Sequence, residues 1–224
     1  MPYCGDDELI VQKLSYCEYW GYYWRVTSRH QIPGIFEWDK NLVNLIMDKC
    51  GIPPNAEILD LGCAGGDQAR LFAQKDCRIT GIDQVPNLID YAKNVFKKEG
   101  LRGDFIVGDF RKIEYSSKFD LCVMLSGTFG FPAENEDRQL LERVHRSLNT
   151  DGKAFIDYLP VESYSKRSRS KTWQPIEGGY ALSEEWYHVP TSTWRTQHTH
   201  ILAEGRIIQA AEENGYGATG LCPP

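Results

Sequence analysis

Between residues 57 and 159 the chain alternates between two hydrophobic patterns. Short apolar runs, typical of strands that are covered on both faces, occur at 57–61, 78–82, 105–107, 119–125 and 153–159. Between them, apolar side chains recur at three- and four-residue spacing, which predicts helices at 68–74, 86–100 and 136–148. Because parallel strands need a long crossover connection, this β-α-β order predicts a parallel sheet with helices on both faces.

The flanking segments follow other patterns. Residues 1–56 are predicted to be mostly helical, including a helix over 38–50, and residues 173–204 alternate like antiparallel strands with a turn near 190–192. Residues 205–214 predict one last helix. The expected parts are an N-terminal helical segment (1–56), an α/β core (57–160 with 205–224) and an antiparallel β insertion near the C-terminus (161–204).

Composition and charge exclude several classes of protein. The chain has 224 residues and a net charge of −6, which disfavours a nucleic acid partner, since phosphate binding needs an excess of Lys and Arg. No apolar run approaches the ~18 residues that a membrane span needs, so no membrane partner is expected. The seven cysteines are scattered without a Cys-x-x-Cys pair, which predicts reduced thiols, no metal site and a cytoplasmic location.

A glycine-rich turn opens directly after the first strand and is headed by an acid, Asp60. A strand, such a turn and a helix start place backbone N–H groups around a bound polar ligand. A loop that cradles pyrophosphate would not carry a carboxylate at its head, whereas a loop that holds a cationic group would. The turn therefore predicts a ligand with a positively charged end near Asp60.

Two more acids, Asp83 and Asp109, end the next two predicted strands. Ligands of open parallel sheets bind beyond the carboxyl ends of the strands, so all three acids should face one crevice. Asp83 follows Asp60 by 23 residues, close to the spacing of an acid that accepts hydrogen bonds from ribose hydroxyls. Asp109 with Phe110 suits an adenine, through an acceptor for its amino group and an apolar neighbour for its ring.

With these residues in place, the chain resembles the class I S-adenosylmethionine-dependent methyltransferases. The resemblance is close over residues 57–159 and loose over 205–214, and it implies a Rossmann-like fold and S-adenosyl-L-methionine as cofactor. It implies these cofactor-binding residues: Asp60, Gly62, Cys63, Ala64, Gly66, Asp83, Gln84, Asp109, Phe110, Leu125 and Ser126. Ala64 replaces a glycine of the family's motif, and a methyl group should be tolerated there if φ stays negative.

The segment that follows the fourth strand indicates the kind of acceptor. Residues 126–131 lack the Asn or Asp followed by Pro-Pro and an aromatic residue that marks the family's nucleic acid amino-methylating members. The resemblance thus implies methyl transfer to an N or O atom of a small molecule. Two alternatives stay open at this point: a nicotinamide-dependent oxidoreductase on a similar sheet, and a non-catalytic module that binds the cofactor.

Candidates for the substrate side lie outside the core. In related small-molecule enzymes an insertion like 161–204 forms a lid and an N-terminal helix covers the pocket. With a turn centred on residues 190–193, Glu185 would oppose His198 and orient it as a catalytic base. An aromatic-rich N-terminal stretch could line the pocket, where rings attract cations: Tyr16, Tyr19, Trp20, Tyr22, Tyr23 and Trp24.

The family's C-terminal hairpin has no counterpart in the sequence. Only residues 216–224 follow the last predicted helix, too few for two strands. Truncation, an uncovered sheet edge and coverage by a partner would each account for this. Since an exposed edge pairs readily with other strands, a homodimer is one of the expected arrangements.

Overall fold

The computed structural model describes residues 10–14, 18, 22, 35–129, 134–158, 169–176, 178–188 and 193–215. The chain divides into two compact units, one made of residues 28–159 and the other of residues 1–27 with 160–224. In the described residues each unit holds one five-stranded sheet.

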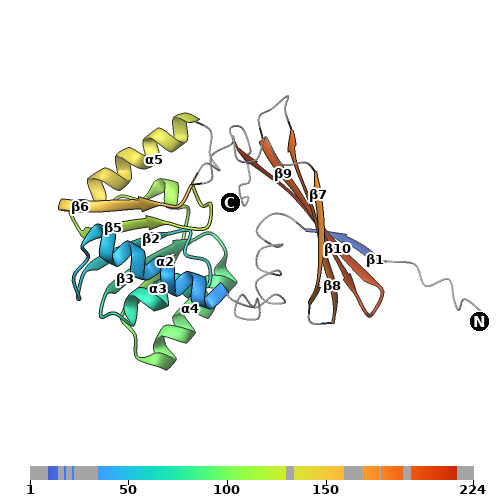
Figure 1. Ribbon diagram of the computed structural model, residues 1–224, viewed down its shortest axis with the longest axis horizontal. Helices are drawn as coiled ribbons and strands as arrows, with labels where there is room; N and C mark the ends of the chain where they lie inside the picture. The colour runs from blue at the N-terminus through green and yellow to red at the C-terminus, as the bar shows by residue number, and fades with distance from the viewer. Residues whose placement is uncertain are drawn as a thin grey trace, which may run out of the picture. The chain divides into compact units, whose positions relative to one another are not determined.

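The sheet of residues 28–159, hereafter the parallel sheet, confirms the predicted α/β architecture. All of its neighbouring strands pair in parallel (Figure 1). Its spatial order is β4 (Gly103–Val107), β3 (Arg78–Asp83), β2 (Glu57–Leu61), β5 (Phe119–Met124) and β6 (Leu148–Ile156). Along β6, regular pairing with β5 begins only at Lys153, where the sequence places the start of this strand.

Helices cover both faces of the parallel sheet, as predicted. Figure 1 shows α5 on one side of the sheet and α2, α3 and α4 on the other. The four helices are α2 (Ile35–Cys50), α3 (Asp67–Ala73), α4 (Pro86–Glu99) and α5 (Glu134–Ser147). Each face has its own buried apolar cluster, so the inner strands are enclosed on both sides. This is why they read as continuous apolar runs in the sequence.

Local signals explain the ends of α4. Pro86 stands in its first turn, where a missing N–H costs nothing, and Gly100 follows its last residue with a φ of 66°. The helix buries Leu88, Ile89 and Phe96 against the sheet. Burial of each such side chain contributes about 1.5–3 kcal/mol, so packing rather than helix propensity holds α4 in place.

A close contact inside this core requires a glycine in β3. A Cβ atom at Gly81 would lie 2.6 Å from Cδ1 of Phe105 and 2.9 Å from Sγ of Cys63. The ring of Phe105 also meets Phe96 edge to face, with 4.6 Å between the ring centroids. The aromatic ring of β4 thus occupies the space that any other residue at position 81 would need.

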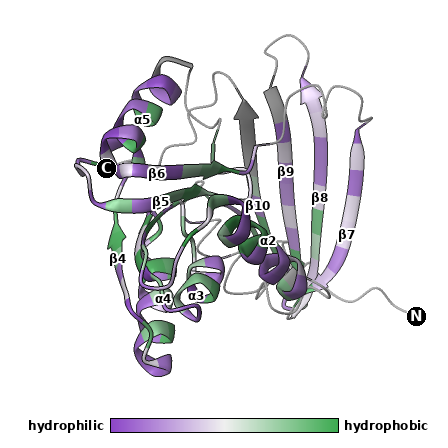
Figure 2. Cartoon of the chain, turned by 60° about the vertical axis from the view of Figure 1, so that its left-hand side comes forward, coloured by the Kyte–Doolittle hydropathy of each residue, from purple (hydrophilic) through white to green (hydrophobic). Residues whose placement is uncertain are grey.

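The second unit contains the predicted antiparallel sheet. Strands β7 to β10 form a meander, and β1 adds to β10 in parallel at the edge. Its spatial order is β1 (Ile10–Lys13), β10 (Arg206–Gly215), β9 (Thr193–Leu202), β8 (Gly179–His188) and β7 (Ser170–Ile176). In Figure 2, β7 and β8 are mostly white and purple, whereas β5 of the parallel sheet is largely green. This sheet is therefore the more polar of the two.

The predicted helix at 205–214 is wrong, because this segment is strand β10. The stretch from Ile207 to Gly215 pairs with β9 over its whole length, and the resulting ladder outweighs the helix preference of its Ala and Glu residues. Residues 206–215 consequently belong to the antiparallel sheet rather than to the α/β core. The prediction that residues 1–56 are mostly helical also fails at Ile10–Lys13, which forms strand β1.

Replacing Gly81 by alanine tests the packing of the parallel sheet. Since the added methyl group would overlap Phe105 and Cys63, we expect Gly81→Ala to lower the free energy of unfolding by about 1–3 kcal/mol. Chemical denaturation measures this change.

The matched control for that substitution is Gly108→Ala. The nearest heavy atom to a Cβ at Gly108 is Cγ2 of Ile82 at 3.8 Å, an ordinary contact. We expect a change of less than about 0.5 kcal/mol there. Equal effects of the two substitutions would contradict the packing argument.

Candidate functional site at the carboxyl edge of the parallel sheet

Three acids stand at the carboxyl ends of three adjacent strands. Asp60 lies in β2, Asp83 ends β3, and Asp109 follows β4 by two residues. Strand β3 pairs in parallel with both of its neighbours, so the carboxyl ends of all three strands share one edge of the sheet. The structure brings the three acids to one edge, as the sequence predicts.

The turn after β2 is held by the end of β3. The backbone N–H of Ala64 donates a 2.9 Å hydrogen bond to Oδ2 of Asp83. Three residues of the turn have positive φ angles: Gly62 (74°), Ala64 (46°) and Gly66 (79°). The φ of Ala64 is therefore not negative, and the condition under which a methyl group is easily tolerated is not met. A left-handed conformation costs a non-glycine residue about 1 kcal/mol. In this conformation Ala64 forms the hydrogen bond to Asp83, which offsets part of that cost.

Gly62 has two reasons to be a glycine. Its φ is in the left-handed region, and a Cβ atom there would lie 2.5 Å from Cγ2 of Thr128. Thr128 is itself fixed, since its hydroxyl donates a 2.8 Å hydrogen bond to the carbonyl of Leu125 at the end of β5. The backbone N–H groups of Gly62 and Cys63 both donate to the carbonyl of Ile82, at 2.8 and 3.2 Å. Segments from β2, β3 and β5 thus meet at this turn.

Asp60, which is buried, and Asp83, which is partly buried, form a pair of like charges. Asp60 is only 3% exposed, and burial, followed by repulsion from Asp83, raises its pKa to about 7. Burial also raises the pKa of Asp83, although N–H groups of Val85 and Ala64 donate to its two oxygens at 2.9 Å and act in the opposite direction. A cation bound beside this pair would favour the ionised form of both carboxyls.

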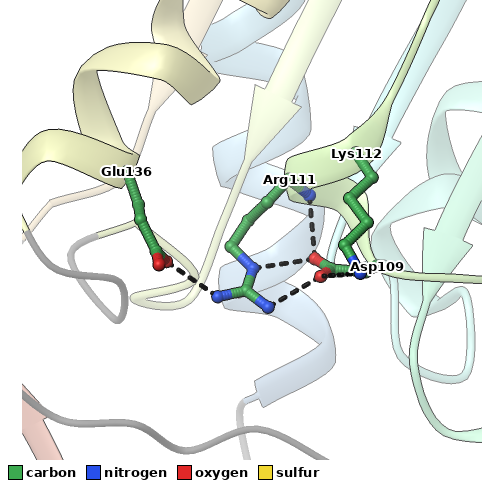
Figure 3. A network of polar contacts seen from close by, with 4 residues as sticks. All are labelled: Asp109, Arg111, Lys112 and Glu136. Atoms are coloured by element: carbon green, nitrogen blue, oxygen red, sulfur yellow. Dashed lines mark hydrogen bonds and ion pairs between the residues drawn. The ribbon is translucent and has the colours of Figure 1, made fainter. Parts of the chain in front are cut away.

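Asp109 has a different environment from the other two acids. It accepts hydrogen bonds from Arg111 at three points: the backbone N–H (3.0 Å) and Nε (2.8 Å) on Oδ1, and Nη2 (2.7 Å) on Oδ2 (Figure 3). These bonds hold the pKa of Asp109 below its usual value against the opposing effect of burial. The remaining nitrogen of the guanidinium, Nη1, donates to Glu136 on α5 at 2.8 Å. Asp109 is thus an ionised, charge-paired acid.

Phe110 does not present an open ring. It begins the short 3-10 helix η2 (Phe110–Lys112), which Asp109 caps, and it belongs to the buried cluster that includes Leu59 and Met124. Phe110 therefore fixes η2 to the sheet, and its predicted stacking on an adenine stays untested. Of the other predicted residues, Leu125 is buried and Gln84 is partly exposed beside Asp83.

Cys63 is buried behind the turn. Its side chain is among the atoms that a Cβ at Gly81 would meet, and its exposure is 4%. Burial, followed by the charges of Asp60 and Asp83, raises the pKa of its thiol well above the ordinary value. A thiol with these surroundings is unreactive and serves to pack the turn against β3.

A polar network that the sequence analysis missed joins α2, α3 and the ends of β5 and β6. Nε2 of Gln68 donates to Asp39 at 3.0 Å and to the hydroxyl of Ser126 at 3.4 Å. The backbone N–H of Ser126, whose φ is 56°, donates to Asp157 at 3.1 Å. Asp157 directly follows β6, near the carboxyl ends of the neighbouring strands, so an acid within the last predicted strand (153–159) was the available signal. Asp39 carried no signal, because its contact with Gln68 depends on the packing of two helices.

His198, the predicted base, lies in the antiparallel sheet. It opposes Ser183, whose hydroxyl is 3.0 Å from its Nδ1, and Glu185 opposes Thr196 instead. The predicted partnership with Glu185 is wrong because the β8–β9 ladder pairs His188 with Thr193, which shifts every partner by two positions. A shift of two keeps each side chain on its predicted face. The neighbouring His200 has a pKa lowered to about 4 by burial and by His198, so it is neutral near pH 7.

Several predicted pocket residues fall outside the described residues: Tyr16, Tyr19, Trp20, Tyr23 and Trp24. Tyr22 is described and buried, and its ring lies 5.2 Å from that of His200. Within the described ranges, no three His, Cys, Asp or Glu side chains are grouped so that they could hold a metal ion. No helix in the described part of the chain is long and apolar enough to span a membrane.

The part of the chain that holds this site is similar to known proteins. Residues 58–152 match the family model of a methyltransferase domain. The cypemycin N-terminal methyltransferase of a Streptomyces species is 32% identical over 103 residues, which cover 45% of this chain and 40% of that protein. The chain therefore spans less than half the length of this relative.

Two solved structures show the same fold at low identity. An S-adenosylmethionine-dependent methyltransferase from Clostridium acetobutylicum has a TM-score of 0.70 and 13% identity, over 91% of this chain and 82% of that one. The sugar N-methyltransferase KedS8 from a Streptoalloteichus species has a TM-score of 0.64 and 16% identity, over 96% of this chain and 84% of that one. Family match and fold agree: residues 58–152 match a methyltransferase domain, and the fold is similar to that of S-adenosylmethionine-dependent methyltransferases.

Proposed function

We propose that the protein transfers a methyl group from S-adenosyl-L-methionine to an N or O atom of a small-molecule acceptor. The observation that carries this proposal is the bond from Ala64 N–H to Asp83, which joins a positive-φ glycine turn to the acid of the next strand. This bond supports the proposal because it brings the glycine-rich turn headed by Asp60 against Asp83, the acid that we assign to the ribose hydroxyls. A nicotinamide dinucleotide would instead bring pyrophosphate to the turn that Asp60 heads.

The residues present fit the proposed cofactor. Asp83 accepts backbone hydrogen bonds from Ala64 and Val85, one on each oxygen, and a carboxylate offers about four acceptor positions, so Asp83 would also accept from ribose hydroxyls. Asp60, buried beside Asp83, would attract the positively charged end of the ligand. Asp109 would accept from the adenine amino group, and Leu125 and Ser126 would border the reacting methyl group. The cofactor itself supplies an activated methyl group on a sulfonium ion.

What remains for the protein is to orient the acceptor, exclude water and receive a proton. Positioning alone accounts for much of the acceleration of such a displacement. We assign the proton to His198, which the antiparallel sheet would contribute as part of a lid. The Ser183 hydroxyl at 3.0 Å from Nδ1 would orient the imidazole of His198. The proposal also includes assembly of the protein as a homodimer and a location in the cytoplasm.

Support for a small-molecule acceptor comes from the sequence. The net charge of −6 disfavours a nucleic acid, and residues 126–131 lack the signature of nucleic acid amino-methylation. The curated relatives include both an N-terminal methyltransferase and a malonyl-[acyl-carrier protein] O-methyltransferase from Acetivibrio thermocellus, so both N and O stand as acceptor atoms.

Calorimetry with S-adenosylhomocysteine and with NAD tests the proposed function. We expect binding of S-adenosylhomocysteine in the micromolar range and none of NAD. Asp83→Ala should weaken the binding by about tenfold or more, since it deletes acceptors for two ribose hydroxyls. Asp104→Ala, an exposed β4 acid whose partner is Arg78 on the surface, is the control and should bind as the wild type does. Failure of the wild type to bind S-adenosylhomocysteine would refute the function.

The raised pKa of Asp60 predicts how cofactor affinity depends on pH. Because a cation binds to the ionised carboxyl, affinity for S-adenosylhomocysteine should fall as pH drops below about 7, by at most about tenfold per pH unit. Asp60→Asn should bind more weakly at pH 8 and lose this dependence. Asp137→Asn removes another acid with a pKa raised to about 6 and should retain it. An identical pH profile in Asp60→Asn and the wild type would contradict the assignment.

His198→Ala should lower the turnover of the methyl transfer and leave the affinity for S-adenosylhomocysteine unchanged. The expected loss is about a hundredfold, the usual contribution of a general base. A screen of candidate acceptors for uptake of a tritiated methyl group provides the assay. His145→Ala, on the exposed side of α5, is the control. If His198→Ala turned over as fast as the wild type, His198 would not be the base, and positioning alone would account for the rate.

A further inference from the structure

The guanidinium of Arg111 binds both oxygens of the Asp109 carboxylate. Nε and Nη2 bind one oxygen each, in the side-on arrangement that fixes the plane of a carboxylate. Both side chains are only 16% exposed, so this pair is largely shielded from water. The backbone N–H of Arg111 adds a third bond to Oδ1. The carboxylate therefore has one orientation.

This arrangement leaves the two oxygens of Asp109 unequal. Oδ1 already accepts two hydrogen bonds, from N and Nε of Arg111, whereas Oδ2 accepts one at hydrogen-bond distance, from Nη2. Lys112 lies 3.8 Å from Oδ2 and is 81% exposed, so it contributes only a weak, screened attraction. A carboxylate oxygen accepts two hydrogen bonds. Oδ2 thus keeps one place for an outside donor, in a plane that Arg111 sets.

The far side of the guanidinium is anchored on α5. Nη1 of Arg111 donates to Oε2 of Glu136 at 2.8 Å, so the arginine bridges η2 and the first turn of the helix that follows β5 (Figure 3). With all three guanidinium nitrogens bound to acids, Arg111 cannot swing away from Asp109 without losing several charge-assisted bonds. The orientation of Oδ2 is therefore tied to α5 as well as to η2.

We propose that Arg111 is a positioning residue: held by Glu136, it aims Oδ2 of Asp109 at the amino group of the cofactor's adenine and so sets the preference for a 6-aminopurine. This inference rests on the proposed function, in which Asp109 faces the adenine. Arg111 itself touches no ligand in this scheme. It acts through the carboxylate that it orients.

A pair of ligands separates this role from a structural one. The probes are S-adenosylhomocysteine and its analogue whose purine carries hydrogen in place of the 6-amino group. The wild type should prefer the amino compound by about tenfold, the value of one hydrogen bond to a charged group. Arg111→Gln should lose most of this preference by weakening S-adenosylhomocysteine alone, and Arg111→Lys, which keeps the charge but not the fork, should lie between.

Two further variants test whether the preference for the amino compound depends on Arg111 and its anchor on α5. Glu136→Gln should reduce the preference partly, and Lys112→Gln, on the same helical turn, should retain it. Equal weakening of both ligands in Arg111→Gln, or no weakening at all, would overturn the proposal. If the wild type binds neither ligand, the proposed function itself fails. If the wild type binds both equally, the function stands and the role of Arg111 falls.

Discussion

The hydrogen bond from Ala64 N–H to Asp83 is the contact on which the site depends. The parallel pairing of β2 with β3 sets Leu61 opposite Ile82, so the chain leaving β2 must turn directly over the end of β3. The turn can close there only if its N–H groups find acceptors, and the Ile82 carbonyl and the Asp83 carboxylate supply them. Their contribution offsets the left-handed conformation of Ala64.

The acids at the carboxyl edge of the parallel sheet have two kinds of environment. Asp109 is paired with Arg111 and stays ionised, whereas Asp60 is buried and the nearby Asp83 is partly buried, with burial raising the pKa of each. Like charges buried together are costly unless a cation joins them. The charge pattern thus differs along the edge: at one end Arg111 balances the negative charge of Asp109, and at the other burial raises the pKa of both carboxyls.

How much the sequence predicted depended on the range of the interactions involved. The parallel sheet and its helices were predictable, because strands enclosed on both faces and amphipathic helices each leave a local pattern. Strand β10 was not, since Ile207, Ile208, Ala210 and Ala211 fit either period and only pairing with β9 decides. The partner of His198 was missed for a related reason: a turn displaced by one residue changes every cross-strand neighbour by two.

The three acids of the sheet edge show the same contrast between local sequence signals and contacts that are distant in the sequence. Their positions followed from strand ends, but their chemistry did not, because it depends on partners from elsewhere in the chain. Asp109 and Arg111 are two residues apart, yet the anchor of that pair, Glu136, is on another element, and Asp39 reaches Gln68 through helix packing. A motif therefore predicts which carboxylates stand at the carboxyl edge of the sheet. Which of them stay ionised, and where their free lone pairs point, is set by arginine and backbone donors that only the folded chain brings together.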